Sequence, residues 1–140
     1  MTRTNEKVDA ELENIERALS ILPAENKLSN GNLTPLETAG VGAVLHDIYN
    51  GLENVLKQLI RHRGRAIPDG DAWHRELLGL AVELKILSEN TADQPKPYLA
   101  FRHFFVHGYS LELDLDRLRP LIQDAKTVVD AFRSDIRKAC

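Results

Sequence analysis

Apolar side chains recur every three or four residues along most of the chain, which is the spacing that places them on one face of an α-helix. One such run extends from about Asn5 to Leu22, and a second from Thr34 to about Arg63. A third begins near Asp71 and continues to Leu87, a fourth begins near Pro97, and a fifth ends near Lys138. Alternation of apolar and polar positions, which is typical of a strand, is almost absent. The pattern therefore predicts an all-α protein.

The second run carries the clearest helix-start signal. Thr34 is placed to cap the helix, Pro35 occupies its first position and Glu37 its third, a combination that forms a capping box. The run ends in Arg61-His62-Arg63-Gly64-Arg65. Cations interact favourably with a helix C-terminus, and glycine tolerates the left-handed backbone that often follows it. We therefore expect one helix of about seven or eight turns.

Turn-forming residues separate the runs. Pro23 and the polar residues Glu25–Asn32 predict a loop, and Pro68–Gly70 predicts a turn. The polar stretch Ser88–Pro97 contains two prolines and predicts a second loop. These connections are short relative to the helices, which favours an antiparallel bundle. It would consist of four main helices and a shorter one, which is the fourth of the five in chain order.

The start of the fifth helix is less clear from the sequence. Asp114 and Asp116 are both candidate caps. Asp116 is the better candidate, because it leaves Pro120 in the first turn, where the missing N–H matters least.

Composition adds the expectation of a soluble protein. The chain has 140 residues, of which 43% are hydrophobic and 28% charged, and its formal net charge of −3 disfavours a protein that coats DNA. No apolar run approaches the roughly 18 residues of a membrane span, and Met1–Lys7 lacks the apolar core of a signal peptide. The lone Cys140 excludes an intrachain disulfide. We therefore expect one cytoplasmic domain over residues 1–140.

The strongest chemical signal is Arg102-His103-Phe104-Phe105-Val106-His107-Gly108-Tyr109, which the fourth helix is expected to carry. Arginine binds phosphate through a planar fork of donors, and histidine exchanges a proton near neutral pH. These two groups suffice for cleavage of an RNA phosphodiester without a metal. The hydroxyl of Tyr109 lies beside them as a group that can bind or be modified.

Arg102 and His107, with His103 directly after the arginine, resemble the Arg-x4–6-His motif of the HEPN superfamily. His107 and Tyr109 extend it to the His-x-Tyr pattern of HepT-like toxins. The flanking runs that are also similar to this group are Tyr98–Phe101, Glu112–Asp114, Arg117–Leu121, Asp47–Lys57 and Ala72–Leu78. The resemblance covers the chain from about Ala43 to Phe132, and this length makes it more specific than the motif alone.

The resemblance implies a HEPN-like bundle that acts as a metal-independent endoribonuclease toxin without a cofactor. Arg102 and His107 would be catalytic, with His103 in support. It also implies a homodimer in which both motifs face one cleft. The implied partner is an MNT-type nucleotidyltransferase antitoxin, which neutralises the toxin by transferring AMP to Tyr109. The alternative is a non-catalytic subunit that binds substrate for this nucleotidyltransferase.

Helix geometry bears on how the motif would work. Residues five apart on a regular helix point about 140° apart, whereas residues seven apart share a face. Arg102 and Tyr109 are therefore expected to align, with His107 pointing elsewhere. A two-fold axis can place two motifs at one phosphate, so we expect a composite site across a dimer. RNA rather than DNA is the expected substrate, because the reaction uses the ribose 2′-OH.

Simpler explanations stay open for these residues. Arg102 and His107 can form a surface ion pair and a helix cap, and Tyr109 can be an interface aromatic. His103 and His107 are four apart, which suits a shared metal, but no paired glutamate follows and we expect no metal site. The candidate RNA-guiding cations are Arg61, Arg63, Arg65, Arg117 and Arg119, although a cationic helix end is the commoner role. A structural dimer module with a residual motif is a third interpretation.

Acidic residues affect the electrostatics of such a site. The glutamates of the first helix are Glu6, Glu11, Glu13 and Glu16, and this helix is expected to present them to solvent. A position of that helix near the cleft would weaken nuclease activity. Glu53 and Asp47 lie on the long second helix, where solvent or a neighbouring helix is the expected partner.

Overall fold

A computed structural model describes residues 2–23, 33–107 and 113–139, and these residues form helices without any strand. In chain order the helices are α1 (Thr2–Ser20), α3 (Pro35–His62), α4 (Trp73–Glu83), α5 (Glu89–Asp93), α6 (Lys96–Val106) and α7 (Leu115–Ala139). The all-α class expected from the sequence is confirmed. Within the same ranges, no helix has the combination of length and apolar character needed to cross a membrane.

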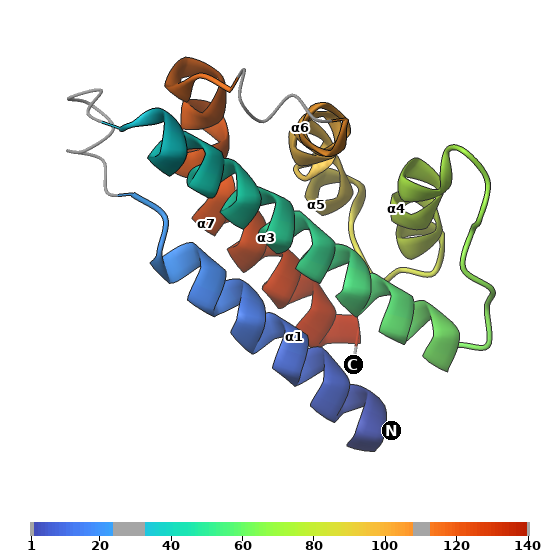
Figure 1. Ribbon diagram of the computed structural model, residues 1–140. Coiled ribbons are helices and arrows are strands. Elements are labelled where there is room, and N and C mark those ends of the chain that lie inside the picture. Colours follow the sequence, from blue (N-terminus) through green and yellow to red (C-terminus); the bar gives the residue numbers. More distant parts are fainter. Residues whose placement is uncertain (1, 24–32, 108–112, 140) are drawn as a thin grey trace.

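The long helix α3 is the centre of the bundle (Figure 1). α1 packs along one side of α3, α4 and α6 lie on the other side, and α7 contacts both α1 and α3. α1 and α3 are antiparallel, since the Thr4 hydroxyl near the start of α1 lies 3.4 Å from Nδ1 of His62 at the end of α3. α6 crosses α3 at a steep angle (Figure 1), and the rings of Phe101 and Phe105 both lie next to Gly42 of α3. α3 and α7 run in the same direction (Figure 1), since Arg63 just after the end of α3 donates a hydrogen bond to the carbonyl of Ala139 at the end of α7.

The core forms where the apolar faces of α1, α3 and α7 meet. Side chains of these helices that are at most 1% exposed include Ile15, Leu45, Leu56, Ile60, Leu118, Val129, Phe132 and Ile136. They lie at the three- and four-residue spacing that predicted the helices. Burial of these apolar side chains supplies the main driving force for the bundle.

The ends of α3 agree with the sequence prediction. Oγ1 of Thr34 accepts a hydrogen bond from the Glu37 N–H, and the Glu37 carboxylate accepts one from the Thr34 N–H, each at 3.0 Å. Gly64, directly after the last turn, has a left-handed backbone with φ of 74°. A capping box and a glycine past the C-terminus therefore set the length of this helix.

Two predictions in the middle of the chain were wrong. The third helix ends at Glu83 and not at Leu87, because Lys85 adopts a left-handed backbone with φ of 60° and the N–H groups of Ile86 and Leu87 turn back to the Ala81 carbonyl. The stretch Ser88–Pro97 is not a simple loop, because it contains α5. Its prolines sit at the start of α6, where a missing N–H costs little.

Side-chain caps explain the remaining differences. The Ser88 hydroxyl accepts from the Thr91 N–H and starts α5. Asp114, rather than the preferred Asp116, caps α7, since its carboxylate accepts from the Arg117 N–H at 2.9 Å. Pro120 consequently lies inside the helix.

Candidate functional site

The motif helix α6 presents one apolar face to the bundle and the rest of its surface to a groove. Tyr98 is buried, and the rings of Phe101 and Phe105 pack against α3 next to Gly42, where a Cβ would lie 3.3 and 3.2 Å from them. The opposite surface of α6 borders a groove of about 1160 Å³ that α4 and α5 close from the other side. Its main lining residues are Leu99, Arg102, His103, Val106 and His107 from α6, with His74, Arg75 and Leu78 from α4.

Arg102 and His107 therefore border the same groove, which differs from the expectation that His107 points elsewhere. The α6 residues that line the groove recur at three- and four-residue spacing, as in Leu99, His103 and Val106, and Arg102 lies at the edge of this stripe. In addition, α6 ends at Val106 and His107 forms its C-cap. The alignment expected between Arg102 and Tyr109 cannot be compared, because Tyr109 lies outside the described residues, as does Glu112 of the flanking pattern.

His107 is oriented by the end of its own helix. Its Nδ1 lies 2.7 Å from the carbonyl oxygen of His103. Because a carbonyl oxygen can only accept, Nδ1 carries the proton in this bond. Nε2 is therefore the nitrogen that is left to meet a ligand, and in the neutral ring it is a proton acceptor.

Arg102 is a cation without an acidic partner among the residues that the structure describes. Its side chain is half-buried, and its charge affects the pKa of two residues of α3. Burial, and after it the charge of Arg102, lowers the pKa of His46. Burial and the Glu53 carboxylate raise the pKa of Tyr49, and Arg102 opposes this rise. A guanidinium held near neutral groups, without a carboxylate to neutralise it, is suited to an incoming anion.

Three buried polar atoms mark the contact between α6 and α3. Nε of Arg102, Nε2 of His46 and the hydroxyl oxygen of Tyr49 have no hydrogen-bond partner within residues 2–23, 33–107 and 113–139. Buried polar atoms without partners are uncommon and often mark functional sites. The polar groups of His46 and Tyr49 on α3 are therefore buried, as is Nε of Arg102.

A buried ion pair extends this polar region toward α4. Nδ1 of His74 lies 2.5 Å from Oε2 of Glu53, whose side chain is only 4% exposed. The ring of Trp73 packs on that of His74 with centroids 3.6 Å apart, and the ammonium of Lys57 lies over Trp73. Glu53 thus pairs with a neighbouring helix, which is one of the two roles expected for it.

Sequence reasoning missed His46, Tyr49 and His74 as parts of the site. A signal for the first two exists, since His46, Tyr49 and Glu53 recur at three- and four-residue spacing along the amphipathic second run. This spacing puts them on one face of α3, the face that meets α4 and α6. No sequence signal assigns His74, because 21 positions separate it from Glu53.

His103 lies beside His107 on the surface of α6. Their ring centroids are 4.2 Å apart, and both side chains are exposed. Within the described part of the chain, no group of three or more His, Cys, Asp or Glu residues is placed to hold a metal ion.

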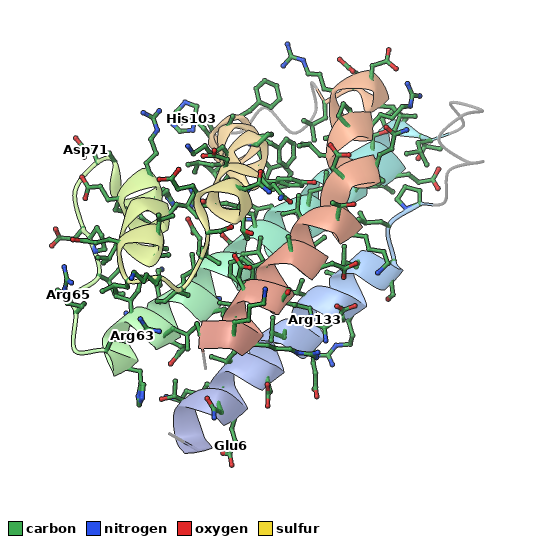
Figure 2. The ribbon with its side chains drawn as sticks, turned by 180° about the vertical axis from the view of Figure 1, so that it is seen from behind. Glu6, Arg63, Arg65, Asp71, His103 and Arg133 are labelled. Carbon is green, nitrogen blue, oxygen red and sulfur yellow. The ribbon has the colours of Figure 1, made fainter. Side chains whose placement is uncertain are left out.

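The arginines proposed to guide RNA lie in two places. Arg61 is in the last turn of α3, and Arg63 and Arg65 follow its end. Figure 2 shows Arg63 and Arg65 well separated from His103. The guanidinium of Arg63 donates to the Leu84 and Ala139 carbonyls, and Arg65 pairs with Glu83 at 3.9 Å, so both join helix ends.

Arg117 and Arg119 lie nearer to the motif, at the start of α7. The guanidinium of Arg117 lies over the ring of Phe104, 5.4 Å from its centroid. Arg119 pairs with Asp116 at 2.8 Å. Arg117 thus contacts the motif helix directly.

The charge around the groove is mixed on one side and positive on the other. Arg75 and Lys96 are offset by nearby lining carboxylates, and Lys96 pairs with Asp93 at 2.6 Å. On the other side, the positive charge is that of Arg102, which lies beside the imidazoles of His103 and His107. The acidic α1 lies across α3 from the groove, and Figure 2 shows Glu6 far from His103. The acidic helix therefore does not face the candidate site.

The fold and the site together define the class of protein. An all-α bundle whose short helix carries an arginine and a histidine toward one groove is a HEPN-like domain. The family model of HepT-like proteins matches residues 40–140, and the chain therefore belongs to the HepT-like family of the HEPN superfamily. This membership confirms the resemblance seen in the sequence. Searches of curated proteins and of solved structures gave no match.

Proposed function

We propose that the chain is a metal-independent endoribonuclease and the toxin of a HEPN-type toxin–antitoxin module. The observation that supports this most is the shared groove, in which Arg102 has no carboxylate partner among the described residues and His107 keeps Nε2 available. Membership of the HepT-like family supports the toxin role.

The reaction uses the ribose 2′-OH as its nucleophile. Nε2 of His107 accepts the proton of this hydroxyl as the oxygen attacks phosphorus. Arg102 stabilises the extra negative charge that develops on the phosphoryl oxygens. The P–O5′ bond breaks, and the products are a 2′,3′-cyclic phosphate and a 5′-hydroxyl. His103 supports the site by orienting His107 through its carbonyl oxygen.

The proposal includes a homodimer and an antitoxin. Two protomers would pair with their motifs in one cleft, so that both contribute to a composite RNA site. An MNT-type nucleotidyltransferase would transfer AMP to Tyr109, two residues beyond His107. The added bulk and negative charge would block the phosphate site beside Arg102.

RNA cleavage by the purified protein tests this function. We expect the full chain to cleave RNA with and without chelator and to leave 2′,3′-cyclic phosphate ends. A 2′-deoxy substitution at the scissile nucleotide should stop cleavage there. Arg102→Ala and His107→Ala should each reduce the rate by a factor on the order of 100 to 10,000, as is typical for loss of charge stabilisation or of a proton-transfer group.

Arg137→Ala is the matched control, because this arginine is exposed on α7 and lies away from the groove. It should cleave RNA at the rate of the unchanged chain. Equal cleavage by the Arg102→Ala and His107→Ala variants would contradict the proposal. Sedimentation of the full chain as a monomer only would contradict the composite site.

One observation favours a second function. The α4 and α5 side of the groove has mixed charge, which suits a protein or nucleotide ligand as well as RNA. The second candidate is a non-catalytic subunit that binds substrate for the nucleotidyltransferase. RNA binding without cleavage by the full chain would support this candidate over the first.

A further inference from the structure

The groove contains an imidazole on the wall opposite the motif. His74 belongs to α4, near its first turn, and it borders the same groove as Arg102 and His107. Its side chain is 15% exposed, so the ring is mostly held by protein and reaches the groove with a small part of its surface. The mechanism derived from the motif residues does not use it.

The partner of His74 is a carboxylate that the fold has removed from water. Glu53 is 3% exposed and lies on the central helix α3. Burial of a carboxylate is unfavourable unless it is paired, and its partner here is Nδ1 of His74 at 2.5 Å. Because a carboxylate accepts hydrogen bonds, Nδ1 of His74 carries the proton and Nε2 is left for a ligand. The Trp73 ring on its other side fixes the plane of the imidazole.

The two imidazoles of the groove therefore differ in one respect. Nδ1 of His107 meets a neutral carbonyl oxygen, whereas Nδ1 of His74 meets a carboxylate. Coulomb attraction makes a carboxylate the better partner for a positively charged ring. Of the two rings, His74 is the one whose protonated form has an opposite charge beside it, and His107 is the one whose neutral form is suited to accept a proton.

We infer that His74, positioned by Glu53, is the general acid of the groove and protonates the leaving 5′-oxygen of RNA. This inference rests on the proposed endoribonuclease function. In the step, the 2′-oxygen forms a bond to phosphorus and its proton passes to Nε2 of His107. The P–O5′ bond breaks, and O5′ takes the proton from Nε2 of His74. His107 ends protonated and His74 neutral, and exchange with water restores both.

This assignment changes what the dimer must provide. A proton acceptor, a proton donor and a guanidinium are all present in the groove of one protomer. The partner subunit then extends the RNA site and need not supply the second proton-transfer group. Glu53 is a positioning residue, since it acts on RNA only through His74.

A change of leaving group separates a general acid from a residue that only supports the fold. An RNA with sulfur in place of the bridging 5′-oxygen releases a thiolate. This leaving group needs no proton, because thiols have a pKa of about 8.5. We expect His74→Ala to cleave ordinary RNA about 100 times more slowly than the unchanged chain. It should cleave the sulfur-substituted RNA at nearly the unchanged rate. Glu53→Gln should show the same pattern with a loss of about tenfold on ordinary RNA.

The comparison variant is His107→Ala, which should be slow on both substrates because it lacks the proton acceptor. Equal loss of His74→Ala on both substrates, or no loss on either, would overturn the assignment of the general acid while leaving the nuclease intact. A His74→Ala variant that fails to fold would also be slow on both substrates, and circular dichroism identifies that case. Glu53→Gln then serves as the second variant for the same comparison of substrates. Failure of the unchanged chain to cleave either RNA would overturn the proposed function, and the role of His74 with it.

Discussion

Tyr98 shows how a single residue fixes the position of the motif helix. It is 3% exposed on a helix whose other large side chains are half-buried or exposed. Its hydroxyl donates a hydrogen bond of 2.6 Å to the Leu121 carbonyl oxygen of α7. This carbonyl belongs to α7, one residue after Pro120, so the hydrogen bond ties α6 to the second turn of α7. Removal of this one oxygen should therefore loosen α6 without touching the groove.

Tyr98→Phe tests this connection. The variant leaves the buried Leu121 carbonyl without its hydroxyl donor, and we expect the free energy of unfolding to fall by about 1 kcal/mol. Urea denaturation followed by circular dichroism at neutral pH measures the change. An unchanged midpoint at an unchanged slope would show that the hydrogen bond contributes nothing to stability.

The same residue predicts a loss of stability in alkali. Burial raises the pKa of Tyr98 and of Tyr49 above the value of about 10 found in unfolded chains. The folded state therefore binds these protons more tightly, and the free energy of unfolding should fall as the pH rises above about 10. Tyr98→Phe should flatten this fall by up to about 1.4 kcal/mol per pH unit. Denaturation series between neutral pH and about pH 11 give the slope of the free energy of unfolding against pH. This slope should be less steep for Tyr98→Phe than for the unchanged chain, and equal slopes would contradict the prediction.

At the scale of the helices, close approach between α1 and α3 depends on a missing side chain. Gly51 is buried on α3, and a Cβ built on it would lie 2.6 Å from Cγ1 of Ile15 and 3.0 Å from its Cδ1. Real Cβ atoms do not come this close to another carbon, so the two helices would have to separate or Ile15 would have to leave its position in the core. Gly40 lies on the same helix with no atom within 4 Å of such a Cβ.

Gly51→Ala and Gly40→Ala form a matched pair. Gly51→Ala should lower the free energy of unfolding by about 1–3 kcal/mol, which is the usual cost of overpacking a core. Gly40→Ala should raise it by up to about 1 kcal/mol, because alanine is the better helix former. Thermal and urea denaturation of both variants should show changes of opposite sign in the free energy of unfolding. Equal effects of the two substitutions would contradict the packing of α1 on α3.

The helices also show what could be predicted from the sequence. The periodic runs, the capping box at Thr34 and the glycine after α3 depend on neighbours a few residues away, and these predictions agree with the structure. The end of α4 and the helix α5 depend on contacts with distant residues. The Asp135 carboxylate of α7 accepts a hydrogen bond from the Ser88 N–H at 2.9 Å. Burial raises the pKa of this carboxyl, but hydrogen bonds from Ser88 and Thr91 outweigh it, so the pKa is lowered. No local pattern could have placed that contact.

The candidate site divides in the same way. Arg102, His103 and His107 are close in sequence, so their spacing identified the motif. The Glu53–His74 pair joins two helices, and only the packing of α4 on α3 brings it to the groove. The side of α6 that faces inward was also not predictable, because the aromatic residues Phe101, Phe104 and Phe105 surround Arg102 and His103 without a clear period.

For the whole molecule, the first helix completes a core that the family match does not include. The match begins at residue 40, whereas α1 buries Val8, Leu12 and Ile15 against the rest of the bundle. Each fully buried aliphatic side chain contributes about 1.5–3 kcal/mol, and a whole domain is stable by only about 5–15 kcal/mol. Three such side chains are therefore comparable with the entire stability of the fold.

Removal of residues 1–33 tests this contribution. We expect the shortened chain to lose cooperative thermal unfolding and to expose apolar surface, because α3 and α7 lose the helix that covers them. Near-ultraviolet circular dichroism and binding of an apolar dye compare it with the full chain. A cooperative transition at the temperature of the full chain would show that α1 is dispensable for folding.

The central helix α3 carries core side chains and the polar groups of His46, Tyr49 and Glu53 along the same turns, and Tyr49 is itself part of the core. Substitution of the buried Tyr49 or Glu53 therefore disturbs both the packing of the bundle and the polar side of the groove. Under the proposed function, substitutions that abolish RNA cleavage and leave the chain folded are expected on α4 and α6, whose exposed groove-lining side chains lie outside the core.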